Sequence, residues 1–168
     1  KDLNERKKAG VYDVKSLGYN YRMTDFQAAL GISQLGKLDS FVARRRSIAS
    51  HYDHSFKSNS HLQIPSKKSL IKHSYHLYPL LFDFERMKID KKMFFDEMKS
   101  NNILLQVHYI PVHLQPYYQQ KFGFKIGDFP NSEKFYEREF SIPMYPKLRQ
   151  DEIDHVVETI NRLLCISQ

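Results

Sequence analysis

The chain has 168 residues and a formal net charge of +7, from 26 Lys and Arg against 19 Asp and Glu. This length predicts one domain, and a hydrophobic fraction of 41% is sufficient for a folded core. No run of residues is long and apolar enough to cross a membrane, and the single cysteine, Cys165, excludes an internal disulfide. We therefore expect a globular cytoplasmic protein that does not act at a membrane.

The basic charge has two functional interpretations. Clustered cations can bind nucleic acid, but the basic residues here are scattered along the chain. The densest cluster, Arg44 to Arg46, falls within a helical pattern and so points in different directions, and no nucleic-acid-binding motif is present. We expect no nucleic acid partner. A basic surface that attracts a nucleotide diphosphate and an ordinary solvated surface both remain open.

The first predicted helix begins at Thr24. Thr24 and Gln27 have the spacing of a capping box, in which each side chain bonds a backbone N–H at the start of the helix. Apolar residues then recur three or four apart, which predicts one long helix over 24–56. Gly31 and Gly36 weaken this helix. A helix of such length is typical of a link between domains.

Three strands and three more helices are predicted beyond a polar loop over residues 57–72. The strands are rich in aromatic and aliphatic residues, and they cover 74–84, 103–109 and 140–144. The helices run from an N-cap at Asp90 to Asn101 and Asn102, over 133–138, and over an apolar stripe at 153–164. This order predicts an α+β fold with an antiparallel sheet of about three strands and helices on one face.

The residues before Thr24 form a candidate anion site. Residues 18–22 carry a glycine, two phenol rings, an amide and a guanidinium. Asn20 offers a directed donor, and Arg22 offers a charged fork that matches a phosphate. An equally open interpretation is a well-capped helix whose arginine covers its own N-terminus.

Other site chemistries have weaker support. Histidines at 73 and 76, and at 108 and 113, fall on extended segments, where residues three apart face opposite sides, so we expect no metal site. A Ser/His/Asp triad is not excluded by composition, but no nucleophile-elbow pattern supports it.

The run GYNYRMTDFQAALGISQL, at residues 18–35, resembles the signature of the DegT/DnrJ/EryC1/StrS aminotransferases. Four further elements resemble that family in the same order, and they are Arg44 to Arg46 with Tyr52, SYHLY at 74–78, HYIPVH at 108–113 and SIPMYP at 141–146. Within the family, the segments at 73–81 and 106–118 are most similar to transaminases of pseudaminic acid biosynthesis.

This resemblance implies the C-terminal small domain of a fold-type-I pyridoxal-phosphate-dependent transferase. Residues 1–23 would be a connecting segment that carries an active-site loop. Residues 24–168 would be the small domain, including the long linking helix. Family members carry a large N-terminal domain with the Schiff-base lysine, and no matching segment is present in this sequence. We therefore expect no catalytic residue in this chain, no activity from it alone and no pyridoxal phosphate bound by it alone.

The resemblance also implies an activity and its partners. The complete homodimeric enzyme would move an amino group, from glutamate, to a nucleotide-linked keto-sugar of the UDP-4-keto-6-deoxy-hexosamine class. Asn20 would donate to the cofactor phosphate across the dimer interface. Six residues would approach the substrate, namely Tyr21, Arg22, His76, His108, Tyr109 and His113. In a regular strand, however, His108 and Tyr109 would point to opposite faces.

Two alternatives remain open within the same fold. One is a catalytically inactive binding or dimerisation module. The other is the dehydratase branch of the family, in which a histidine replaces the lysine at a position outside this sequence.

Overall fold

The first described helix is α1 (Asp25–Leu35), and it begins as its capping box predicts. In the computed structural model, which describes residues 16–68 and 70–165, the Gln27 N–H donates to Thr24 Oγ1 at 3.3 Å. In return, the Thr24 N–H donates to Gln27 Oε1 at 3.0 Å. None of the residues of α1 is buried.

The single helix predicted over 24–56 is two helices in the structure. α1 ends at Leu35, and α2 (Leu38–Phe56) begins after a turn at Gly36 and Lys37. Glycine is a poor helix former because its backbone loses the most freedom on ordering, which explains why the helix ends here. The chain divides at this turn into two units, 1–37 and 38–168. Residues 1–15 of the predicted connecting segment and the terminal residues 166–168 lie outside the described residues.

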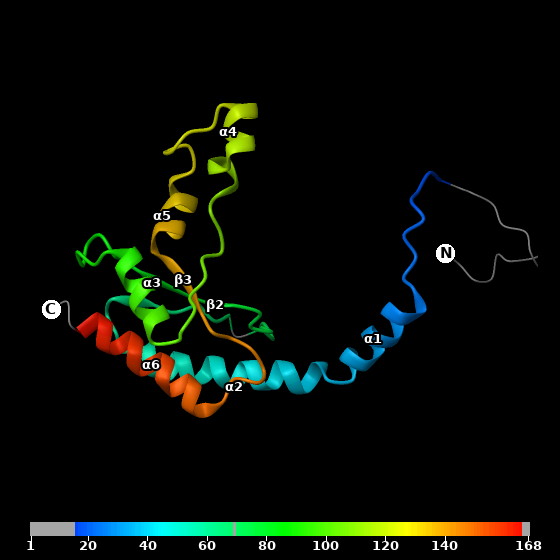
Figure 1. Ribbon diagram of the computed structural model, residues 1–168, viewed down its shortest axis with the longest axis horizontal. Helices are drawn as coiled ribbons and strands as arrows, with labels where there is room; N and C mark the ends of the chain where they lie inside the picture. Colours follow the sequence, from blue (N-terminus) through cyan, green and yellow to red (C-terminus); the bar gives the residue numbers. More distant parts are fainter. Residues whose placement is uncertain (1–15, 69, 166–168) are drawn as a thin grey trace, which may run out of the picture. The chain divides into compact units, whose positions relative to one another are not determined.

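The described part of the second unit combines short strands with helices (Figure 1). Its strands are β1 (Leu62–Gln63), β2 (Tyr78–Phe82) and β3 (Glu139–Ile142). Its helices after α2 are α3 (Lys91–Ser100), the 3-10 helix η2 (Val112–Leu114), α4 (Pro116–Phe122), α5 (Pro130–Arg138) and α6 (Gln150–Cys165). None of the described helices combines the length and apolar character that a membrane span needs.

The sheet is antiparallel, and its strands lie in the order β1-β2-β3. The predicted α+β class and the number of strands are confirmed, but the membership of the sheet differs from the prediction. The segment 103–109 makes one isolated bridge, between Gln106 and Ser141, and is not a strand. The two-residue strand β1 lies in the stretch that was predicted to be a loop.

One hydrophobic core joins the sheet to three helices. Side chains alternate along β2, so that Tyr78, Leu80 and Phe82 are buried, and they share this core with the buried residues of α2, α3 and α6. The ring centroids of Tyr52 on α2 and Tyr78 are 5.1 Å apart. Figure 1 shows α2 and α6 running alongside each other, and the two helices are in contact.

The helix α3 begins and ends as the sequence predicts. The Asp90 carboxylate accepts the Met93 N–H at 2.7 Å as the N-cap, and Asn101 is the C-cap residue. Asn102, the next residue, has a positive φ of 60°. Asparagine tolerates this left-handed geometry better than most residues, and the pair therefore turns the chain out of the helix.

The helix α4 lies at the far end of a projection that leaves the sheet after residue 108 and returns through α5 (Figure 1). Within the projection, the Glu133 carboxylate accepts the N–H of Gly127 at 2.8 Å and that of Phe129 at 3.2 Å. The His113 ring lies 2.8 Å from the same carboxylate. Burial alone would raise the pKa of Glu133, but these hydrogen bonds outweigh burial and hold that pKa below its usual value.

The lowered pKa predicts a loss of stability in acid. A carboxyl group whose pKa is lower in the folded state stabilises the fold above its unfolded-state pKa of about 4.3, and the contribution is lost as the pH falls through the folded-state pKa. We expect the Gly127 amide proton, followed by NMR, to titrate with a midpoint below about 4.3. Glu133→Gln should abolish this titration, and Glu158→Gln, on the exposed side of α6, should not. A midpoint above that value in the unmodified chain would contradict the assignment.

Candidate functional site

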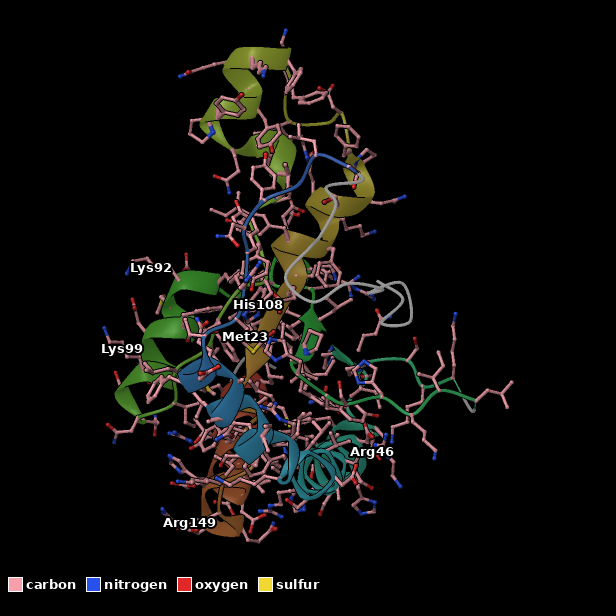
Figure 2. All side chains as sticks on the ribbon, turned by 90° about the vertical axis from the view of Figure 1, so that its right-hand side faces the viewer. Met23, Arg46, Lys92, Lys99, His108 and Arg149 are labelled. Carbon is pink, nitrogen blue, oxygen red and sulfur yellow. The ribbon has the colours of Figure 1, made fainter. Side chains whose placement is uncertain are left out.

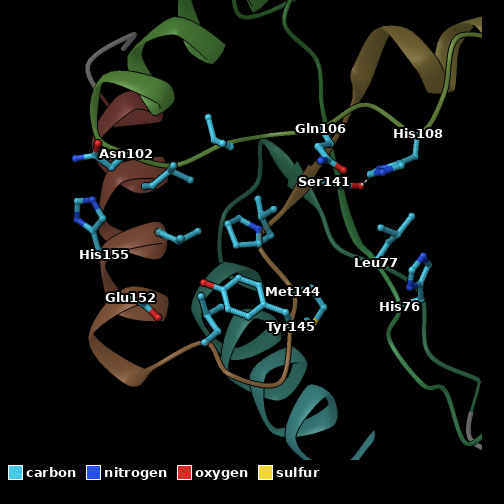
Figure 3. A pocket seen from close by; sticks show the side chains of 16 residues that line it. His76, Leu77, Asn102, Gln106, His108, Ser141, Met144, Tyr145, Glu152 and His155 are labelled. Atoms are coloured by element: carbon cyan, nitrogen blue, oxygen red, sulfur yellow. Dashed lines mark hydrogen bonds between the residues drawn. The ribbon is translucent and has the colours of Figure 1, made fainter. Parts of the chain in front are cut away.

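A cavity of about 550 Å³ lies between β3, the segment 102–108 and the first turns of α6 (Figure 3). His76 and His108 lie at one end of this pocket, and Asn102 and His155 at the other. The remaining lining residues are Leu77, Ile103, Leu104, Gln106, Ser141, Ile142, Pro143, Met144, Tyr145, Leu148, Glu152 and Val156. Apolar and polar side chains thus line the pocket together, and a concave surface that offers both can bind a small molecule.

Three consecutive arginines of α2 hold the segments around this pocket. Arg45 Nη1 donates to the carbonyl oxygens of Tyr75, His76 and Met144 at 2.9, 3.1 and 2.8 Å. It therefore fixes the chain before β2 to the chain after β3, and both carry residues that line the pocket. Arg44 donates to the carbonyl of Leu148, and Arg46 donates to that of His73.

These contacts give the basic cluster a structural role. All three guanidinium groups bond backbone carbonyl oxygens, and the three arginines are only half-exposed. By contrast, Lys92 and Lys99 on α3 point away from the core into solvent (Figure 2). The three arginines reach different segments of the chain, as their consecutive places on a helix predict.

The wall at the His108 end is a chain of three hydrogen-bonded side chains. The His108 Nδ1 atom lies 2.9 Å from Ser141 Oγ, and the Ser141 hydroxyl donates to Glu139 Oε1 at 2.6 Å. The backbone N–H of His108 donates to the other carboxylate oxygen at 2.9 Å. Glu139 is fully buried, and the His108 side chain is 10% exposed.

Lys91 bonds the segment that leads into Glu139. Its ammonium group donates to the carbonyl oxygens of Tyr136, Glu137 and Glu139 at 2.9, 3.1 and 3.0 Å, which satisfies the C-terminal end of α5. Burial lowers the pKa of Lys91, and the nearby charge of Glu139 opposes that change. The lysine thus fixes the point at which α5 passes into β3.

The structure brings together two of the predicted substrate residues, His76 and His108. Tyr109 is next to the pocket but 72% exposed, and its ring makes an edge contact with His108 at a centroid distance of 4.8 Å. The expectation that these two side chains point to opposite faces applied to a regular strand, and this segment is not one. His113 does not line this pocket; it is buried in the projection between Glu133 and Phe129.

The other predicted residues belong to the first unit. Asn20, Tyr21 and Arg22 lie on the loop before α1, and all three are exposed. The rings of Tyr19 and Tyr21 are stacked, with a centroid distance of 5.0 Å. The described residues contain no group of side chains suited to a metal ion.

Sequence reasoning missed the residues that hold the pocket in place. Glu139, Ser141, Arg45 and Lys91 were not among the candidates. A signal was present for Glu139, since it is an acidic residue next to a predicted strand over 140–144. One of its partners, Ser141, is only two residues away, but the other, the backbone N–H of His108, comes from a segment far away in the sequence that no local pattern predicts.

The sequence of this chain matches a known protein family. Residues 3–161 match the DegT/DnrJ/EryC1/StrS aminotransferase family. The chain belongs to this family. It is 39% identical over 154 residues to the spore coat polysaccharide biosynthesis protein SpsC of Bacillus subtilis, covering 91% of this chain and 40% of that protein. It is 35% identical to the UDP-4-amino-4,6-dideoxy-N-acetyl-beta-L-altrosamine transaminase of Campylobacter jejuni, covering 90% and 40%.

Solved structures of family members share the fold. Helicobacter pylori PseC, an aminotransferase of pseudaminic acid biosynthesis, matches with a TM-score of 0.82 and 31% identity over 95% of this chain and 42% of that one. The pyridoxal-phosphate form of the sugar aminotransferase Spr1654 from Streptococcus pneumoniae matches with a TM-score of 0.82 and 28% identity over 95% and 40%. Aminotransferases of this family use pyridoxal phosphate. The chain spans about 40% of the length of these curated relatives.

The arginine contacts predict a large effect of one substitution. Arg45→Met keeps a long apolar side chain but removes every donor to the three carbonyl oxygens. Since a hydrogen bond from a charged donor contributes about 1.5–3 kcal/mol, we expect the free energy of unfolding in urea to fall by about 2–4 kcal/mol.

Arg149→Met is the matched control. Arg149 is 65% exposed and pairs with Asp151 and Glu152 at the start of α6 (Figure 2). Exposed ion pairs contribute about 0–1 kcal/mol, so the control should change the free energy of unfolding by no more than that. Equal losses in the two variants would show that Arg45 does not hold the pocket segments together.

Proposed function

We propose that this chain is the C-terminal part of a pyridoxal-phosphate-dependent aminotransferase that acts on a nucleotide-linked keto-sugar. The substrate class is a UDP-4-keto-6-deoxy-hexosamine, and the amino donor is glutamate. The family supports the reaction, and the names of the Campylobacter jejuni and Helicobacter pylori relatives support the sugar. The structural observation that carries the proposal is the pocket lined by His76 and His108 within a chain of this family.

The residues of the chain fit one part of a cofactor site. Asn20 and Arg22 are exposed donors on the loop that precedes a capped helix, and an amide with a guanidinium suits a phosphate group. No lysine lines the pocket, and the half-buried Lys91 already bonds three carbonyl oxygens. We propose that the cofactor-binding lysine comes from a large N-terminal domain, and that the chain alone is inactive.

In the assembled enzyme, the residues of this chain bind and orient. Pyridoxal phosphate, when bound, would supply the electron sink for the transfer of the amino group. Asn20 donates to its phosphate across a homodimer interface, and Arg22 pairs with the diphosphate of the sugar nucleotide or the carboxylate of the donor. His76, His108 and Tyr109 approach the sugar, and Tyr21 is a further residue for the substrate. His113 was also assigned to this group, but its bond to Glu133 indicates a structural role.

The cofactor role of Asn20 can be tested in the complete enzyme. Asn20→Ala removes one hydrogen bond to a charged phosphate, so cofactor affinity, measured by absorbance titration, should fall roughly 10- to 100-fold at an unchanged melting temperature. Asn131→Ala, at another exposed asparagine, should leave cofactor affinity unchanged. An Asn20 variant with full affinity would contradict the assignment, and one that loses stability instead would identify Asn20 as a local turn former.

A further inference from the structure

We infer that Glu139 and Ser141 are positioning residues that hold the His108 imidazole in a single tautomer, with its Nε2 atom left as a hydrogen-bond acceptor for a ligand hydroxyl. The ligand half of this inference rests on the proposed function, because a sugar supplies such hydroxyl groups. The tautomer half rests on hydrogen bonds within the chain alone.

The first step concerns the carboxylate. Glu139 is 0% exposed, and each of its two oxygens faces a donor. The backbone N–H of His108, which donates to Oε2 at 2.9 Å, can never accept. The Ser141 hydroxyl donates to Oε1 at 2.6 Å, a short distance typical of an O–H bond to a charged oxygen. The Ser141 proton is therefore committed to Glu139.

The second step concerns the imidazole. Because the Ser141 proton points to Glu139, Ser141 Oγ has only lone pairs to offer to His108 Nδ1, 2.9 Å away. The Nδ1 atom must then carry a proton and donate. In a neutral imidazole one nitrogen donates and the other accepts, so Nε2 is the acceptor. The alternative tautomer would place two lone pairs against each other across this bond.

The third step concerns access. His108 lines the cavity, and no described residue bonds its Nε2 atom. Ser141 also lines the cavity, but its proton is already used. At this end of the pocket, the chain therefore presents an acceptor to a donor group of the ligand. A sugar hydroxyl is such a group, whereas a bare keto oxygen is not.

The inference can be tested by removing only the charge of the carboxylate. In Glu139→Gln the backbone N–H of His108 still requires an acceptor, so the amide oxygen must face it and the amide NH₂ must face Ser141. The Ser141 hydroxyl then accepts from the glutamine and donates to His108 Nδ1. The tautomer should invert, so that Nε2 carries the proton. If Glu139 only stabilised the fold, Glu139→Gln would not invert the tautomer of His108.

Nitrogen NMR of the imidazole ring in this chain reads the tautomer directly, at a pH well above the usual histidine pKa of about 6.5. We expect a protonated Nδ1 in the unmodified chain, a protonated Nε2 in Glu139→Gln and the unmodified pattern in Glu137→Gln, an exposed carboxylate on α5. Ser141→Ala, which serves if the first variant does not fold, should yield a mixture of tautomers. An unprotonated Nδ1 in the unmodified chain, or a tautomer unchanged in both Glu139→Gln and Ser141→Ala, would overturn the inference.

The ligand half is tested in the complete enzyme with UDP-linked keto-sugar and glutamate as probes. Glu139→Gln should slow the sugar half-reaction roughly tenfold, because the ligand hydroxyl must turn from donating to His108 Nε2 to accepting from it, and should leave the glutamate half-reaction unchanged. Equal slowing of both half-reactions would overturn the ligand half. If the unmodified enzyme performs neither half-reaction, the proposed function fails, while the NMR result on the tautomer stands by itself.

Discussion

A carboxylate shielded from water governs the arrangement of the pocket. Removing an ion from water costs several kcal/mol, so a buried carboxylate is stable only when donors surround it. Glu139 obtains those donors from Ser141, two residues along its own strand, and from the backbone of His108, far away in the sequence. The segment 103–109 is thus tied to β3 at His108 and at the Gln106–Ser141 bridge, although it forms no regular strand. The position of His108 follows from the need to satisfy Glu139.

The positive charges near the pocket work in a similar way. Arg45 and Lys91 each place one cationic group among three carbonyl oxygens. Arg45 joins the chain before β2 to the chain after β3, and Lys91 joins α3 to the junction of α5 and β3. Charged donors make stronger hydrogen bonds than neutral ones, which suits them to holding irregular segments that lack a strand ladder. Arg45 and Lys91, which support the pocket, therefore use their donors for hydrogen bonds within the protein. His76 and His108 line one end of the pocket.

Local features of the fold could be predicted from the sequence, and contacts between distant segments could not. The caps at Thr24, Asp90 and Asn101 depend on residues within one turn of helix, and each was predicted at its residue. The break at Gly36 was underestimated, because the apolar spacing continues through it. The segment 103–109 has the composition of a strand, but Glu139 and the turn towards the projection prevent a ladder.

The same distinction applies to the site. Family resemblance pointed to His76 and His108, which the structure places in one pocket, and to His113, which the structure places with Glu133. The hydrogen bonds that orient His108 were not predictable, because they depend on which side chain is buried beside which backbone N–H.

A crystal structure of the complete aminotransferase with a UDP-linked amino sugar would test most directly whether this pocket binds the sugar. The account predicts that the sugar ring occupies the end of the pocket near His76, with a hydroxyl oxygen within about 3.2 Å of His108 Nε2. A sugar bound elsewhere, with no atom in contact with His76 or His108, would contradict it.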